Sequence, residues 1–327
     1  MEGTIGPDSE GAEVGPEAKP SLDWRRVATG AGIICLALAG AFFAIYRDRD
    51  TFVDTIRHIG PEAVVVSALC GLAGVSCAYP TWKEVLTGLG VEIPWGPGGR
   101  VFFTSQLGKY VPGSVWPAVM QMEAGRARGA NRRTMLGANL TAIVLSCSSG
   151  LIVAAVLLPL YDASALAHYW WALLALPFLL VMLHPRALPG LMDRIFLLLR
   201  RPPLGERLDA RHEARAFAWS LLMWLGLGVH LAVLAAAASH WSVSIVLLCI
   251  GGMALAVSLG ILFIPAPAGA GVRDVILVLV LGSVMGSSQA LAVVVASRAI
   301  LIVCDLTAAG LAAFTVRRRA RSISGAG

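Results

Sequence analysis

Charged residues are scarce in this sequence. Asp, Glu, Lys and Arg make up 14% of its 327 residues, whereas soluble domains carry about a quarter. Hydrophobic residues make up 57% and gather in uncharged runs that reach the roughly 20 residues a helix needs to cross a bilayer. We therefore predict an all-α, polytopic membrane protein with about eight transmembrane helices. The runs are Val27–Tyr46, Ala63–Trp82, Thr134–Tyr161, Ala163–Leu183, Ala216–Ser239, Trp241–Val272 and Val275–Ser297.

The motifs of several enzyme classes are also missing. There is no G-x-S-x-G, no nucleotide-binding loop and no pair of carboxylates at catalytic spacing. The six cysteines lie in apolar runs without CxxC or Cys/His ligand spacing, which is typical of small buried hydrophobic residues. His230, in a run of Leu and Ala, is expected to be a buried, hydrogen-bonded histidine. We predict no enzyme activity, no metal and no cofactor.

Two tails flank the membrane domain. Residues 1–22 are rich in Gly, Glu and Pro and are expected to be a disordered cytoplasmic tail. Residues 23–317 form the predicted transmembrane domain, and residues 318–327 form a basic cytoplasmic tail. Arginines cluster at 126–133, 186–215 and 317–321, and the positive-inside rule assigns these regions to the cytoplasm. We predict a multi-pass protein of the cell membrane with both termini inside; its net charge of +6 relates to the membrane and not to nucleic acid.

One apolar segment cannot cross the membrane. Lys83–Arg100 and Arg126 both fall on the cytoplasmic side, and the segment Val101–Met122 between them is too short to cross twice. We predict that it forms a re-entrant hairpin with its turn near Pro112 and Gly113. Non-helical backbone at membrane depth needs protein or water to satisfy its polar groups, so the hairpin is expected inside the bundle.

A second interruption lies about half a chain length later. "FIPAPAGAGVRD", Phe263–Asp274, again joins an apolar helix to a Pro/Gly break, a charged pair and a new helix. Paired broken helices in the two halves of a chain are typical of transporters with a binding site at a repeat interface. We therefore expect an inverted repeat. The helices that start after Gly113 and Gly271 would each direct unpaired N–H groups toward an anion.

Few ionisable residues remain inside the bilayer, where each charge costs about 2.5–3.5 kcal/mol on insertion scales. Three are cations and two are carboxylates, which leaves a positive excess that favours an anionic ligand. The aspartates are equally well explained as helix caps and counter-charges. Gln106 and Tyr110 share a helix face near the first break. The five ionisable residues are Lys109, Arg273, Asp274, Arg298 and Asp305.

Three stretches resemble the lysylphosphatidylglycerol synthase transmembrane region, a flippase-like family. They are "FFTSQLGKYVPGSVWP", "PAPAGAGVRDVIL" and "ASRAILIVCDLTAAG", and the resemblance covers about Val27 to Val316. Asp274 departs from the family pattern, which often has Glu there. The motif positions are Gln106, Gly108, Lys109, Tyr110, Pro112, Gly113, Trp116, Pro267, Gly269, Gly271, Arg273 and Arg298.

The resemblance implies movement of an anionic-headgroup lipid, either a phospholipid or a polyprenyl-phosphate-linked sugar, between leaflets. Bifunctional members carry a soluble synthase domain that we do not expect here, so synthase activity is not implied. The alternatives are a non-catalytic membrane partner of a glycosyltransferase or lipid synthase, and an integral membrane transferase using Asp274 or Asp305 as base. The expected partners are the bilayer, the anionic lipid and such an enzyme. The substrate-binding candidates are Gln106, Lys109, Tyr110, Gly113, Trp116, Arg273, Asp274, Arg298 and Asp305.

Overall fold

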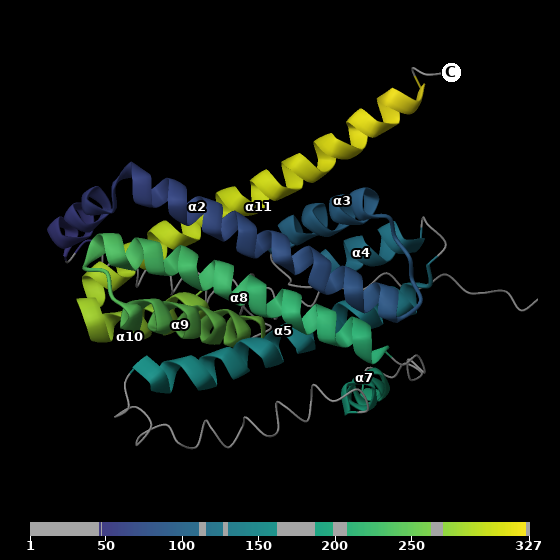
Figure 1. Cartoon of the computed structure of the whole chain (residues 1–327), viewed down its shortest axis with the longest axis horizontal. Coiled ribbons are helices and arrows are strands. Elements are labelled where there is room, and N and C mark those ends of the chain that lie inside the picture. Colours follow the sequence, from purple (N-terminus) through teal and green to yellow (C-terminus); the bar gives the residue numbers. More distant parts are fainter. Residues whose placement is uncertain are drawn as a thin grey trace, which may run out of the picture.

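The described part of the chain is helical and contains no strand, which confirms the all-α prediction (Figure 1). The computed structural model describes residues 46, 48–110, 116–126, 130–161, 187–198, 208–262 and 271–324. The predicted disordered tail at 1–22, most of the first predicted span and the whole span 163–183 lie outside these residues. So does Gly113.

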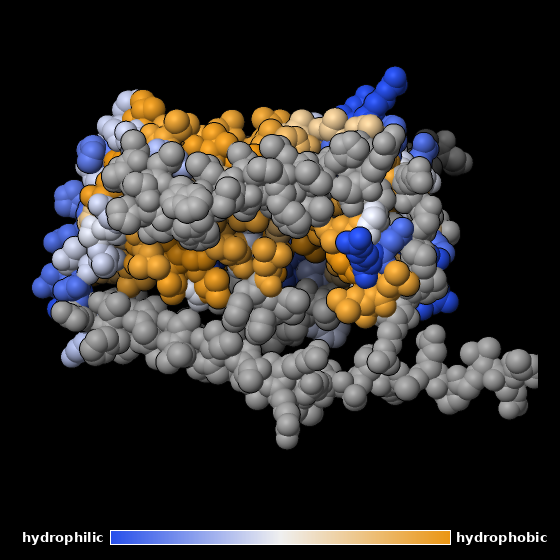
Figure 2. Space-filling model, turned by 90° about the horizontal axis from the view of Figure 1, so that it is seen from below, coloured by the Kyte–Doolittle hydropathy of each residue, from blue (hydrophilic) through white to orange (hydrophobic). Residues whose placement is uncertain are grey.

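Five of the described helices are long and apolar enough to cross a membrane, and the protein is a helical membrane protein. Such spans are helical because a bilayer offers no water to satisfy backbone N–H and C=O groups. Figure 2 shows hydrophobic residues over the middle of one face and hydrophilic residues at its two ends. The five are α2 (Arg49–Gly88), α5 (Arg132–Tyr161), α8 (Ala210–Ala238), α9 (Val243–Leu262) and α11 (Ser287–Ser324, with its apolar window ending at Phe314).

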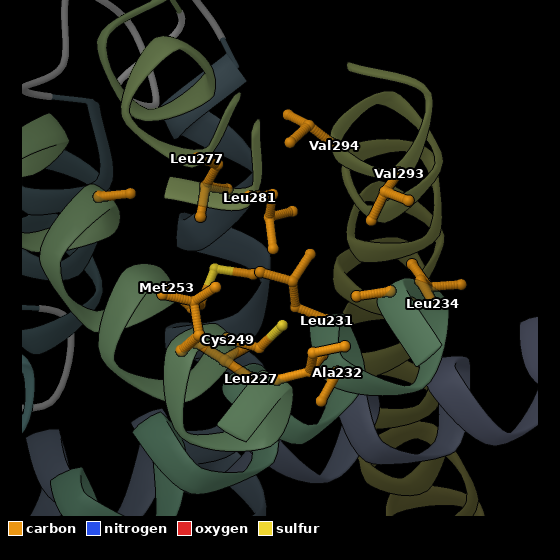
Figure 3. Packing of buried hydrophobic residues seen from close by; sticks show 14 of the residues in the cluster. Leu227, Leu231, Ala232, Leu234, Cys249, Met253, Leu277, Leu281, Val293 and Val294 are labelled. Atoms are coloured by element: carbon orange, nitrogen blue, oxygen red, sulfur yellow. The ribbon is translucent and has the colours of Figure 1, made fainter. Parts of the chain in front are cut away.

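Two hydrophobic clusters hold the helices together. The first joins α8, α9, α10 (Val272–Met285) and α11 through aliphatic side chains that point toward one another (Figure 3). The second joins α2, α5, α8, α7 (Ala187–Leu198) and α3 (Trp95–Gln106), with Trp82 and Phe102 in contact. The first cluster is built almost entirely from the apolar runs of the sequence. The second also draws on residues between those runs, among them Leu86, Phe102 and Phe196.

Glycines allow α2 and α8 to cross closely. A Cβ added at Gly74 would lie 2.7 Å from the backbone nitrogen of Leu227, and one added at Gly226 would lie 2.7 Å from the Cα of Gly74. Both distances are shorter than any stable carbon contact. Small residues at such crossings bring helix backbones together, and packing between backbones drives helix association in lipid.

Two short helices form a hairpin where the sequence predicts one. α3 continues into the 3₁₀ turn η1 (Leu107–Tyr110), and α4 (Trp116–Arg126) packs against α3. The Nε2 of Gln121 donates to the Oγ of Ser105 at 2.9 Å, which ties the two arms together. The two arms thus pack together at one end of the bundle, while the predicted turn at Pro112–Gly113 lies outside the described residues. That the hairpin re-enters the membrane stays a prediction.

The second interruption is followed by a break that hydropathy did not predict. The apolar run Val275–Ser297 was expected to form one span, but α10 ends at Met285 and Gly286 turns the chain with φ 81° into α11. Glycine adopts this positive φ without strain, and it leaves the hydropathy of the run unchanged. The 14 residues of α10 cover about 21 Å, less than the roughly 30 Å of the hydrocarbon core.

The two interrupted segments enter the bundle from opposite ends. The α10–α11 turn lies beside the end of α8, since Gln289 bonds the carbonyl of Ala238, whereas α3 and α4 lie at the other end (Figure 1). Opposite entry is the arrangement that an inverted repeat predicts. α11 runs past both segments and continues to Ser324, so the predicted basic tail at 318–327 begins as helix.

Candidate functional site

Both interrupted segments reach the middle of α11. Lys109, in η1, places its Nζ 2.7 Å from the Oδ2 of Asp305. Asp274, in the first turn of α10, accepts a hydrogen bond from the Nη1 of Arg298 at 2.5 Å. Arg298 and Asp305 lie two turns apart, about 10 Å along one face of α11. Residues predicted from three distant segments therefore form one charged cluster.

Asp305 fastens the first hairpin to α11. Its side chain is 5% exposed and accepts hydrogen bonds from the Lys109 ammonium and the Tyr110 hydroxyl. Lys109 is about one-third exposed, so its ammonium can reach a ligand from the same position. Gly108 is buried, and a Cβ there would lie 3.0 Å from the Cβ of Trp116. The hairpin tip is thus held closely on both sides.

Asp274 has two roles at once. Gly271 has a φ of 85°, and its N–H donates to the Asp274 Oδ2 at 3.2 Å, which caps the first turn of α10. The same oxygen receives the guanidinium of Arg298. The capping and counter-charge interpretations of this aspartate are therefore both correct. Its other oxygen, Oδ1, is buried without a hydrogen-bond partner among the described residues.

Arg273 carries the positive charge that remains. Among the residues that the structure describes, its Nε is buried without a hydrogen-bond partner, and the salt bridges of the cluster join other cations to the two aspartates. Since Lys109 pairs with Asp305 and Arg298 pairs with Asp274, the positive excess expected from the sequence falls on Arg273. The predicted ligand-binding roles of Lys109 and Arg298 must accommodate these pairs, which the sequence did not indicate.

The remaining predicted residues surround the first hairpin. Gln106 is the last residue of α3, one turn before Tyr110, and is partly buried. Trp116 begins α4 and is 42% exposed, so its indole lies at the edge of the hairpin. Gly113 falls outside the described residues. A ligand held near Lys109 would lie close to Tyr110 and Trp116 on the same hairpin.

A second polar group lies beside the site, in a position that the sequence did not indicate. His230 of α8 is fully buried and bridges Ser67 of α2 and Ser297 of α11, at 2.7 Å to one hydroxyl and 2.9 Å to the other. Ser297 directly precedes Arg298. The histidine is a satisfied buried residue, as expected, but its link to the charged cluster was not. The only signal was the presence of polar residues within apolar runs, which in membranes favours bonding across helices.

One family model matches the chain over the segment that contains this site. The model described as "Lysylphosphatidylglycerol synthase TM region" matches residues 27–309, which include every member of the charged cluster. The match covers most of the chain. A search of curated proteins found no match.

Proposed function

The chain belongs to the lysylphosphatidylglycerol synthase TM region family, and from this membership and the charged cluster we propose that it is a lipid flippase. It would move a lipid with an anionic headgroup between the two leaflets of the cell membrane. The family links the chain to membranes and to lipid metabolism; the movement of lipid is our proposal.

One observation carries this proposal: two broken segments from opposite ends of the bundle meet at charged residues midway along a spanning helix. A lipid headgroup crosses a bilayer slowly because its charge must leave water. Fixed polar groups at mid-depth would replace that water and lower the barrier. Each segment would lead from one membrane surface toward the site, as alternating exposure to the two leaflets requires.

The residues suggest a division of roles. The guanidinium of Arg273, whose Nε is buried, and the N–H groups at the start of α10 would bind the phosphate. Lys109 and Tyr110 would contact the headgroup from the opposite hairpin, with Gln106 and Trp116 at its edge. The acyl or polyprenyl chains would stay in the surrounding lipid. This role requires no covalent chemistry and no cofactor.

The cellular setting follows from the same proposal. The arginine-rich connections would face the cytoplasm, together with both termini. A lipid synthase or glycosyltransferase would supply the lipid on one side or use it on the other, and would be the natural partner. Nucleic acid has no part in this function.

Reconstitution tests the proposal directly. Liposomes would contain the protein and phosphatidylglycerol labelled on an acyl chain, and dithionite would quench the label exposed in the outer leaflet. We expect wild type to accelerate exchange, and Lys109→Ala and Arg273→Ala to lose most of the acceleration. Arg132→Ala is the matched control, because this arginine pairs with Glu123 away from the site and both are exposed. It should exchange lipid as wild type does.

Other outcomes would assign the chain to another class. A folded wild-type protein that accelerates none of several anionic lipids would contradict the proposal and favour a non-catalytic partner of a lipid enzyme. Turnover of a lipid-linked substrate in detergent, lost in Asp305→Asn, would instead favour an integral membrane transferase.

A further inference from the structure

The charges of the described cluster can be counted one by one. The cluster contains the cations Lys109, Arg273 and Arg298 and the carboxylates Asp274 and Asp305, which leaves one positive charge. The described helices add no further charge in their apolar stretches, because no Asp, Glu, Lys or Arg occurs at 63–82, 134–161, 216–239, 243–262 or 275–297. The breaks at 111–115 and 263–270 are equally uncharged in sequence.

This excess charge is costly without a ligand. A charge inside the hydrocarbon region is unfavourable unless a partner neutralises it. The carboxylates near Arg273 are already engaged, Asp305 by Lys109 and Asp274 by Arg298. The cluster is therefore neutral as a whole only when it holds a ligand with a single negative charge.

We infer that the transported headgroup carries one net negative charge, as a phosphodiester with otherwise uncharged substituents does. This inference rests on the proposed flippase function and narrows its substrate class. A zwitterionic headgroup would leave the site at +1, a dianionic one would bring it to −1, and a cationic aminoacyl ester would raise it to +2. Phosphatidylglycerol and a polyprenyl-phosphate-linked sugar share the required chemistry.

The geometry also disfavours a second negative charge. Asp305 is nearly fully buried at the hairpin tip, and the Oδ1 of Asp274 is buried without a described hydrogen-bond partner. Both carboxylates lie within the cluster that would surround the ligand. A dianion would meet these oxygens after its first charge had been neutralised, and like charges brought together discriminate strongly between ligands.

Three matched lipids test the inference in the liposome assay. They share one labelled acyl chain and one phosphodiester, and differ in charge: phosphatidylethanolamine is neutral, phosphatidylglycerol is −1 and N-succinyl-phosphatidylethanolamine is −2. We expect wild type to move phosphatidylglycerol at least about tenfold faster than the other two, since one uncompensated charge at the bilayer centre opposes each of them. A fourth arm with a labelled polyprenyl-phosphate sugar shows which source of the phosphodiester is preferred.

Charge-altering variants make the test specific. Asp305→Asn and Asp274→Asn each raise the count to +2 and should shift the preference to the succinyl lipid. Arg273→Gln lowers it to zero and should shift the preference to phosphatidylethanolamine. Arg132→Gln, away from the site, should keep the wild-type order.

The outcomes distinguish the inference of a singly charged headgroup from the flippase proposal on which it rests. Equal rates for all three lipids, or a preference unchanged in every variant, would overturn the charge rule and leave the flippase proposal standing. Opposite shifts in the two aspartate variants would also overturn it, because the net charge of the cluster would then not determine which lipid is preferred. Movement of no lipid at all would reject the flippase proposal and, with it, this inference.

Discussion

At the scale of single residues, His230 connects three helices. Its Nδ1 lies 2.7 Å from the Ser67 hydroxyl and its Nε2 lies 2.9 Å from the Ser297 hydroxyl, in a position that is fully buried. Because Ser297 precedes Arg298, the histidine helps to set the rotation of α11 at the charged cluster. It is thus a positioning residue for the site.

Replacement of His230 by Leu should lower the stability of the bundle. The two hydroxyls would lose a shared partner in an apolar setting, at a cost of about 1–3 kcal/mol. The measurement is thermal unfolding in detergent micelles. His240→Leu is the control, because His240 is exposed beyond the end of α8 and should leave unfolding unchanged. An equal effect of both substitutions would contradict a role for the buried bridge.

Tyr110 offers a finer test at the same scale. Tyr110→Phe removes only the hydroxyl that donates to Asp305 and leaves the Lys109–Asp305 pair in place. Hydrogen bonds to charged groups contribute about 1.5–3 kcal/mol, so we expect the hairpin tip to be held less firmly and lipid exchange to slow by several-fold. The loss should be smaller than in Lys109→Ala. Unchanged exchange in Tyr110→Phe would show that this contact does not position the tip.

At the scale of elements, the crossing of α2 and α8 depends on the absence of side chains. Gly226→Ala would place a methyl group 2.7 Å from the Cα of Gly74, where only backbone movement can relieve the overlap. Overpacking of this kind costs about 1–3 kcal/mol. We expect a lower unfolding temperature in detergent. Gly310→Ala in α11, where a Cβ meets nothing within 4 Å, is the matched control and should be neutral or stabilising.

Hydropathy and arginine placement predicted the membrane class and the first hairpin, but not the division of the last apolar run. The hairpin was predictable because its ends fall on one side and its length forbids two crossings. The turn at Gly286 was not, since glycine is also common inside membrane helices and the run keeps its hydropathy through it. Two spans of the predicted count lie outside the described residues.

The members of the site were predictable, whereas their pairing was not. Charged residues within apolar sequence are easily recognised, and this identified Lys109, Arg273 and Asp274 before any fold was known. Which carboxylate meets which cation depends on how α10 and η1 approach α11, and this is set by distant packing in the two clusters. The unpaired state of Arg273 follows from those pairs and could not be read from its neighbours in sequence.

At the scale of the whole molecule, the chain connections sort into two ends. Asp48 bonds Ser288, so the start of α2 lies beside the α10–α11 turn. A Cβ at Gly88 would contact Leu208 and His212, so the end of α2 lies beside the start of α8. The positive-inside rule predicts that the second end faces the cytoplasm.

Accessible thiols would test this arrangement and the re-entrant hairpin together. Cysteines would replace Glu92 and Arg126, which are exposed at the two ends of the hairpin, and His240, which is exposed at the α8–α9 connection. A membrane-impermeant maleimide on intact cells should label the third and spare the first two until the membrane is permeabilised. Wild type gives the background, since its described cysteines are buried or partly buried.

The pattern of labelling then decides between two topologies. Glu92 and Arg126 on the same side require α3 and α4 to turn back within the membrane, which brings Lys109 to mid-depth beside Asp305. Glu92 and Arg126 on opposite sides would mean that the segment crosses, and every later helix would then be inverted relative to α2. Since the contact of Asp48 with Ser288 fixes those two ends together, that result would contradict the structure itself and not only the assignment of its cytoplasmic end.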